Sequence, residues 1–145
     1  RVPTIATWPK KIKPGTYSEH PSTFYDYYAT VSDIINKELP YSIDGISYYP
    51  TLIDEKQDKH DYLYWEFPAY GGQQAIRINK WKGIKKNLLK GPSELQLYNL
   101  DEDPKELNDI AFKYPEIVSR MEVLLEEAHT TPKMDKFKIP VLDNK

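Results

Sequence analysis

A stretch rich in aromatic residues, 61–81, constrains the fold more than any other part of this 145-residue chain. It begins with a run of Tyr, Trp and Phe, continues through a loop that contains Pro68 and the pair Gly71-Gly72, and ends in a second β-prone run. Aromatic and β-branched side chains suit a pleated, half-buried surface, and paired glycines supply the positive φ that a tight turn needs. The stretch therefore predicts a β-hairpin.

Two further strands and a helix are predicted after the hairpin. The strands are expected over 81–87 and 95–100, and Asp103 is expected to cap a helical turn. The helix is expected over Pro115–His129, and one stripe of it is apolar: Ile117, Val118, Met121, Leu124, Leu125 and Ala128. Strands joined by short turns and followed by such a helix predict an α+β fold, in which an antiparallel sheet of about four strands packs against the helix.

The residues before the hairpin are predicted to form a separate unit. Residues 2–8 are mostly apolar, which is typical of a strand buried in a larger sheet; alone, its edges would be unpaired, and self-association or a rearranged strand is expected. A helix is expected over Pro21–Lys37, followed by a short helical segment over 46–53. The apolar stripe of the Pro21–Lys37 helix consists of Phe24, Tyr27, Tyr28, Val31, Ile34 and Ile35. The charged loop 54–60 is the predicted boundary, which divides the chain into domains 1–60 and 61–145.

Composition and motifs exclude several classes of function. The absence of cysteine excludes a disulfide framework, a Cys-ligated metal site and a Cys nucleophile, and the 3 histidines form no closely spaced ligand pair. A net charge of −2 gives no electrostatic reason to expect nucleic acid or an anionic membrane as a partner. No apolar run approaches the roughly 20 residues that span a bilayer. The basic cluster at 80–86 fits an edge strand protected by lysines better than a nucleic-acid surface.

The two faces of the hairpin are predicted to differ. Leu63, Trp65 and Phe67 alternate with polar neighbours, and we expect them to join Ile76 and Ile78 in a core against the Pro115–His129 helix. The polar set consists of Glu66, Tyr70, Gln73, Gln74 and Arg77. It is either a solvated face or a recognition surface, because planar amide and guanidinium groups beside Tyr rings suit sugar hydroxyls and anions.

The hairpin and several other segments resemble the C-terminal region of type I (formylglycine-dependent) sulfatases of the arylsulfatase or N-acetylgalactosamine-6-sulfatase kind. The hairpin residues that carry the resemblance lie in 60–67 (HDYLYWEF), 71–77 (GGQQAIR) and 79–82 (NKWK). The others lie in 1–12, in a helix with Asp26 and Thr30, in 44–52 (DGISYYPTL) and in 97–106 with the helix that follows. These segments cover almost the whole chain in order.

The resemblance implies that 1–60 is the tail end of an alkaline-phosphatase-like α/β catalytic domain and that 61–145 is the C-terminal subdomain. The family hydrolyses sulfate esters with a formylglycine, made within a Cys/Ser-x-Pro-x-Arg motif, and with a calcium ion. This sequence has no such motif, and the positions that match the family's catalytic and calcium residues would lie upstream of Arg1. No catalytic residue, metal ligand or cofactor is therefore expected in this chain, which we expect to be inactive alone.

The resemblance also makes the polar set of the hairpin a candidate substrate-binding surface. The C-terminal sheet of the family closes one side of the active-site cleft, so Glu66, Tyr70, Gln73, Gln74 and Arg77 would contact a sulfated sugar. The resemblance also implies a location: periplasmic or secreted if the protein is bacterial, or lysosomal. The alternative is a free-standing carbohydrate-binding or protein-interaction domain.

Overall fold

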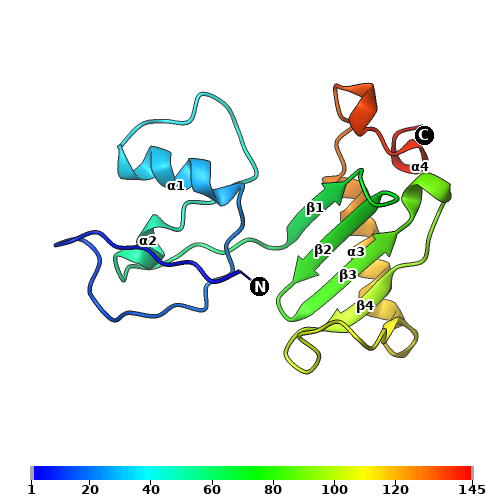
Figure 1. The fold of residues 1–145 in the computed structure, drawn as a ribbon, viewed down its shortest axis with the longest axis horizontal. Helices are drawn as coiled ribbons and strands as arrows, with labels where there is room; N and C mark the ends of the chain where they lie inside the picture. Colours follow the sequence, from blue (N-terminus) through cyan, green and yellow to red (C-terminus); the bar gives the residue numbers. More distant parts are fainter. Residues whose placement is uncertain (1, 145) are drawn as a thin grey trace. The chain divides into compact units, whose positions relative to one another are not determined.

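The computed structural model describes residues 2–144, which form two compact units, 1–60 and 61–145 (Figure 1). The division falls after His60, where the charged loop of the sequence ends. That 1–60 is the tail of a larger catalytic domain stays a prediction. Each unit is described by itself below.

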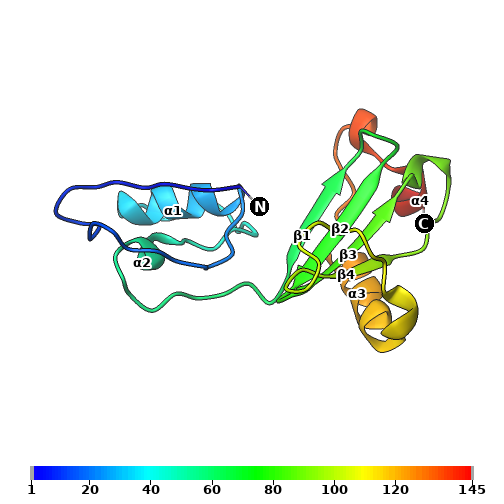
Figure 2. The same cartoon turned by 60° about the horizontal axis from the view of Figure 1, so that its bottom comes forward.

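The unit 61–145 contains a four-stranded antiparallel sheet in sequence order: β1 (Leu63–Phe67), β2 (Gln73–Ile78), β3 (Trp81–Lys86) and β4 (Gln96–Asn99). Helix α3 (Pro115–Ala128) lies across one face of it (Figures 1 and 2). The predicted α+β fold and its final helix are therefore confirmed. The short elements are η1 (Leu88–Lys90), η2 (Ala111–Lys113), η3 (Asp135–Phe137) and α4 (Pro140–Asp143).

The main core lies between the sheet and α3. Ile76, Leu97, Met121 and Leu125 have almost no exposed surface, and they pack together with Ile78, Leu95 and partly buried neighbours. Gly83 lies beneath the helix, where an added Cβ would come within 2.9 Å of the Met121 sulfur. A side chain at this position would therefore have to displace Met121 and Leu95, and glycine lets α3 lie close to β3 without that shift.

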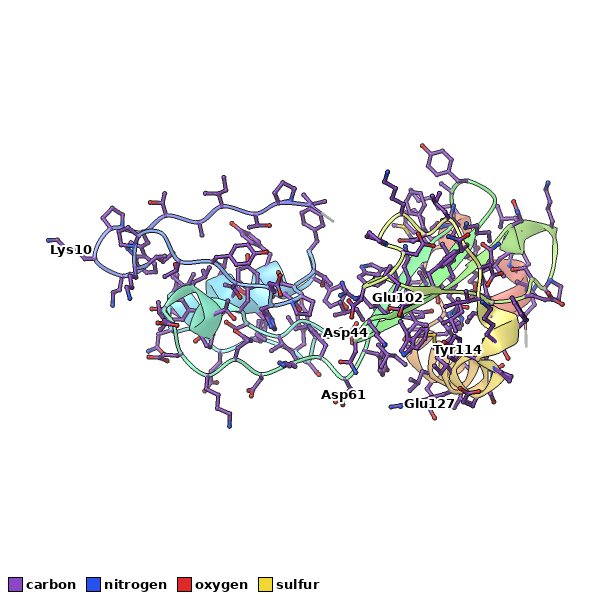
Figure 3. All side chains as sticks on the ribbon, turned by 90° about the horizontal axis from the view of Figure 1, so that it is seen from below. Lys10, Asp44, Asp61, Glu102, Tyr114 and Glu127 are labelled. Atoms are coloured by element: carbon purple, nitrogen blue, oxygen red, sulfur yellow. The ribbon has the colours of Figure 1, made fainter. Side chains whose placement is uncertain are left out.

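Tyr114 anchors the start of α3 to the sheet. Its ring lies 4.9 Å from the Trp81 ring, centroid to centroid, and Figure 3 shows it on the sheet side of the helix. Glu127, near the other end of α3, points away from the sheet in the same view. The helix therefore has the apolar inner face and the polar outer face that its sequence predicts.

The hairpin register contradicts the predicted faces. Directly paired residues of neighbouring strands share one face of the sheet. Trp65 pairs with Ala75, and Glu66 pairs with Gln74, so Leu63, Trp65 and Phe67 lie on the face turned away from α3. We call this face the open face. The prediction that these three residues pack against the helix is wrong. The length of the 68–72 turn sets the strand register, and a shift of one residue in the register exchanges the two faces.

The outer edge of β4 is covered by the chain that follows it. Leu97 donates its N–H to Asp109 Oδ1 (3.0 Å) and accepts a hydrogen bond from the Ile110 N–H (2.9 Å). No helical turn is assigned after Asp103; its carboxylate accepts the N–H groups of Leu107 and Asn108, both at 2.8 Å, within a tight turn. Side-chain bonds of this kind stabilise turns as readily as helix starts.

The unit 1–60 is organised around α1 (Asp26–Ile34) and α2 (Tyr49–Leu52). Helix α2 lies within the predicted segment, but α1 is shorter than the predicted Pro21–Lys37, and Asn36 with φ 53° follows its end. Residues 2–8 are exposed and have no pairing partner in this structure; that they form a strand buried in a larger sheet stays a prediction.

The apolar stripe of α1 does not form a core. Phe24, just before the helix, is 92% exposed, and Tyr27, Tyr28 and Ile35 are also exposed. Asp26 and Thr30 are buried in their place. Periodicity correctly predicted a helix here but not which side of it faces the rest of its unit.

Candidate functional site

The structure separates the five residues predicted to bind substrate. Glu66 and Gln74 lie on the helix side of the sheet, whereas Gln73 and Arg77 lie on the open face. Tyr70 lies in the turn between β1 and β2, where its side chain is 83% exposed. The five residues therefore do not form one surface.

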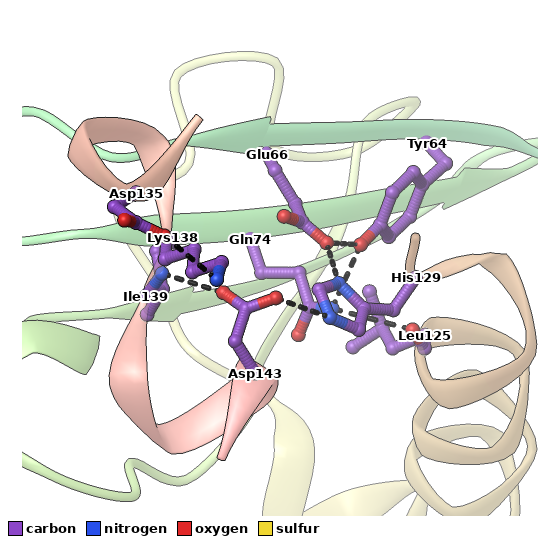
Figure 4. A network of polar contacts seen from close by, with 9 residues as sticks. All are labelled: Tyr64, Glu66, Gln74, Leu125, His129, Asp135, Lys138, Ile139 and Asp143. Carbon is purple, nitrogen blue, oxygen red and sulfur yellow. Dashed lines mark hydrogen bonds and ion pairs between the residues drawn. The ribbon is translucent and has the colours of Figure 1, made fainter. Parts of the chain in front are cut away.

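Glu66 belongs to a network that surrounds His129, the residue directly after α3 (Figure 4). Its Oε1 atom accepts hydrogen bonds from the Tyr64 hydroxyl and from Nδ1 of His129, the latter at 2.5 Å. The other ring nitrogen, Nε2, lies 3.1 Å from Asp143 Oδ1. An imidazole that contacts two carboxylates donates to both only when both of its nitrogens carry protons.

The same network fixes the end of the chain and the second strand. The buried Asp143 carboxylate also accepts the Ile139 N–H at 2.7 Å, and Gln74 donates to the Tyr64 hydroxyl (3.0 Å) and to the Leu125 carbonyl (3.2 Å). Burial raises the pKa of Tyr64, and the nearby Glu66 carboxylate raises it further although the bond from Gln74 opposes this. The phenol therefore stays neutral and donates.

Few features of the sequence predict this network. His129 is the last residue of the predicted helix, and no sequence motif marks Asp143. The residues that meet here come from β1, β2, α3 and α4, and only tertiary structure brings them together. They link these elements, so Glu66 and Gln74 have a structural role whatever else they contact.

The open face carries a different set of side chains. Trp65 and Phe67 are 37% and 51% exposed, and the Phe67 and Tyr70 rings stack with centroids 5.9 Å apart. Gln73 lies beside Phe67 in the register, and Arg77 is oriented by a bond from its Nε to the Asn79 carbonyl (2.9 Å). Aromatic rings, an amide and a guanidinium on one surface can bind a sugar or an anion.

In the unit 1–60, the residues that resemble sulfatase motifs have structural partners. The Asp26 carboxylate accepts the N–H groups of Thr23 (2.7 Å) and Ile46 (3.0 Å) and contacts His60 Nε2 at 2.7 Å. The Thr30 hydroxyl donates to the Asp26 carbonyl and accepts the Tyr48 N–H. These bonds join α1 to the segment before α2.

Gly45 is required by the same packing. A Cβ added there would lie 2.2 Å from the Tyr25 carbonyl oxygen, so any side chain would push this segment away from the start of α1. Asp26, Thr30 and Gly45 therefore build the fold of this unit, and nothing in their geometry indicates that they bind a ligand.

The described residues do not fit the cofactors that the sulfatase resemblance implies. Between residues 2 and 144, no three His, Asp or Glu side chains are arranged to hold a metal ion. The sequence also lacks the cysteine or serine motif from which formylglycine is made. In the same part of the chain, no helix has the length and apolar character needed to cross a membrane.

Comparisons with known proteins agree on one family. Residues 1–131 match the family model described as N-sulphoglucosamine sulphohydrolase, C-terminal. The chain is 30% identical to N-acetylglucosamine-6-O-sulfatase from Bacteroides thetaiotaomicron, in an alignment that covers 97% of this chain and 26% of the relative. It is 31% identical to human arylsulfatase K, with 92% and 26% covered.

A solved structure agrees with the sequence relatives. It was determined in complex with its substrate D-glucosamine-2-N,6-O-disulfate, and it matches with a TM-score of 0.69 and 27% identity over 83% of this chain and 26% of that chain. The chain therefore spans about a quarter of the length of the curated relatives that it matches.

Proposed function

This chain belongs to the N-sulphoglucosamine sulphohydrolase C-terminal family, and on that premise we propose that it is the C-terminal region of a longer protein that hydrolyses a sulfate ester of a carbohydrate. The observation that carries the proposal is the family match over residues 1–131, together with relatives of which this chain spans about a quarter. The region would complete the fold and supply one wall of the substrate cleft. Alone, it would be inactive.

The catalytic groups would come from the rest of that longer protein. Sulfatases of this family use calcium and a formylglycine, and neither fits the described residues of this chain. The part of the reaction proposed for this chain is therefore binding and positioning of the sugar.

The proposed substrate class is a sulfated amino sugar. Relatives of this chain are named for 6-O-sulfates of N-acetylglucosamine and N-acetylgalactosamine. Of the five residues predicted to bind substrate, Tyr70, Gln73 and Arg77 are proposed to contact it, because they lie in the turn or on the open face. Glu66 and Gln74 are proposed to support the hairpin from the helix side through their bonds to His129, Tyr64 and Leu125.

The test compares the full-length protein with this chain. With calcium present, the full-length protein should release sulfate from N-acetylglucosamine 6-sulfate or from an aryl sulfate, and the 145-residue chain should release none above buffer. Turnover by the chain alone contradicts the proposed division of roles. A native protein with a mass near 17.0 kDa would instead support the free-standing binding domain.

A further inference from the structure

A loop in the unit 1–60 carries positive charges that the fold of this unit does not use. We call residues 8–15 the basic loop; its exposed lysines are Lys10, Lys11 and Lys13. Residues 2–18 contain no Asp or Glu, and among the described residues no carboxylate lies within ion-pair distance of these lysines. In the other basic cluster, at 80–86, two lysines are paired with glutamates at 2.6 and 3.2 Å.

A tight turn holds the lysines of the basic loop beside an aromatic ring. The Trp8 carbonyl accepts the N–H groups of Lys11 (3.0 Å) and Ile12 (2.9 Å). The Lys11 Nζ lies 6.0 Å from the centroid of the Trp8 ring, and that ring contacts Tyr49 with centroids 6.3 Å apart. Figure 3 shows the Lys10 side chain pointing away from the rest of its unit. The turn therefore presents cations and a ring together.

The basic loop also curves around a hollow. Residues 6–16 alone line it, and its volume is about 670 Å³, within the range of sites that hold a small organic ligand. The Thr16 hydroxyl donates to the Lys13 carbonyl at 2.9 Å, which fixes the end of the loop. A ligand at the lysines therefore has room beside the backbone of the loop.

We propose that the basic loop binds a sulfated polysaccharide, with sulfate groups paired with Lys10, Lys11 and Lys13 and a sugar ring packed on Trp8. An ammonium group attracts a sulfate as a point charge, and the apolar C–H face of a pyranose packs against an aromatic ring. Short segments rich in lysine are typical of surfaces that bind polyanions. The proposal rests on the proposed function for the choice of a sulfated sugar as the polyanion.

The charge of the rest of the chain disfavours a nucleic acid at this loop. The whole chain has a net charge of −2, and the acidic residues of the unit 1–60 all lie within 19–58, so its unopposed positive charge is concentrated in the loop. Nucleic acid carries closely spaced phosphates and needs a basic surface that follows them. A polysaccharide carries its sulfates farther apart, and three lysines on one loop suit it better.

Binding is tested by calorimetry on the 145-residue chain. The probes are a heparin octasaccharide, the same octasaccharide without its sulfates, and an eight-residue oligodeoxythymidine. The parent chain should bind the sulfated probe most tightly, and its affinity should fall as the salt concentration rises. A variant with Lys10→Gln, Lys11→Gln and Lys13→Gln should bind the sulfated probe about threefold to hundredfold more weakly, the loss expected for three exposed charge pairs.

The matched control is a variant with Lys37→Gln, Lys56→Gln and Lys59→Gln. These lysines are exposed in the same unit but lie outside the basic loop, so the control removes equal charge and should bind as the parent chain does. Equal weakening in the two triple variants, tighter binding of the oligonucleotide than of the sulfated probe, or no binding of the sulfated probe by the parent chain would each overturn the proposal.

Trp8 is tested by two substitutions. Trp8→Ala should weaken binding of the sulfated probe about twofold to tenfold, the range for loss of one aromatic contact. Trp8→Phe keeps a ring and should retain most of the affinity, which separates loss of the ring contact from loss of structure. Binding by Trp8→Ala at the parent affinity would overturn the role of the ring.

A second measurement asks whether the basic loop is accessible in the full-length protein. There, the substitutions at Lys10, Lys11 and Lys13 should weaken binding of the heparin octasaccharide by the same factor and leave kcat/KM for an aryl sulfate unchanged. Equal binding by the full-length parent and variant would overturn the proposal for the whole protein. A full-length protein without any sulfatase activity contradicts the proposed function, whereas the comparison of parent and variant binding still decides this proposal.

Discussion

The two units of the chain are held together by different interactions. In 61–145, apolar side chains from the sheet and α3 form a continuous core. In 1–60, Ala29 is the only apolar residue that is buried among the described residues, and hydrogen bonds around Asp26 and Thr30 connect the segments. Polar bonds fix direction and spacing, but they contribute little net stability compared with a buried core. The unit 61–145 should therefore be much the more stable of the two.

The exposed apolar side of α1 reflects the same difference between a unit with an apolar core and a unit held by hydrogen bonds. Its apolar residues face outward because the polar residues Asp26 and Thr30 face the rest of the unit. An apolar stripe on the outside of a helix is typical of an element that packs against further chain. Under the proposed function, the catalytic part of the longer protein would cover it.

The largest effect is expected for Asp26→Ala. This change removes the acceptor of two backbone N–H groups and of His60, and breaking a buried polar or ionic group of this kind costs about 3–5 kcal/mol. Because 1–60 has almost no apolar core, we expect it to lose its structure. Hydrogen exchange at the Thr23 and Ile46 amides should show loss of protection.

Asp33→Ala is the control for this change. Asp33 lies on the same helix, but its carboxylate accepts one bond, from the half-buried Ser47 hydroxyl at 2.7 Å. The substitution should cost less than about 1 kcal/mol. If the amides of Asp26→Ala stayed as protected from exchange as those of Asp33→Ala, the hydrogen bonds around Asp26 would not be what stabilises this unit.

Next in size is Leu125→Ala, which tests the apolar core of 61–145. Leu125 is fully buried between α3 and the sheet, and truncating such a leucine costs about 2–5 kcal/mol. Amide exchange within β2 and β3 should accelerate by the corresponding factor, without complete loss of structure. Val123→Ala, on the exposed side of the same helix, should change the free energy of unfolding by less than about 0.5 kcal/mol. Equal effects of the two changes would contradict the assignment of the core.

The sequence predicted 61–145 better than 1–60 for this reason. Period-two and helical patterns report which side chains avoid water, and in α3 the predicted stripe is the buried one. In α1 the same pattern selected the exposed side, because Asp26 and Thr30 bind backbone groups far away in sequence. A helical pattern carries no information about such partners.

The candidate site shows a second limit of sequence reasoning. Alternation correctly divided the hairpin into two sets of residues, but only the register shows which residues of β1 share a face with which residues of β2. Glu66 and Arg77 were therefore placed together although they lie on opposite faces. His129 and Asp143 could not be linked to Glu66, because these contacts depend on where the chain after α3 returns to the sheet.

A smaller effect is expected for His129→Ala, which removes the main polar link within the apolar-core unit. The carboxylates of Glu66 and Asp143 would then lose a shared partner, at a cost of about 1–3 kcal/mol. Ile139 is fully buried and should keep part of the final segment in place. Limited trypsin digestion should cut faster after Lys133, Lys136 and Lys138, whereas α3 stays protected. Cleavage at the parent rate would show that the apolar contact alone holds this segment.

The smallest effect concerns pH in the unit 1–60. Burial lowers the pKa of His20 below its ordinary value of 6.5; the Asp26 carboxylate opposes this shift, and His60 and Lys59 add to it. The pKa of His20 is lower in the folded state than in the unfolded state, so the unfolded state binds more protons once the pH falls below about 6.5. The contribution of His20 to the stability of the folded state is therefore present above that pH and is lost below it. In the parent chain, amide protection in 1–60 should therefore decrease from pH 7.5 to pH 5, and His20→Gln should show a smaller decrease. The difference between the two pH profiles then measures the effect of His20 together with its interactions with Asp26 and His60. Identical profiles would mean that His20 does not couple the stability of this polar unit to pH.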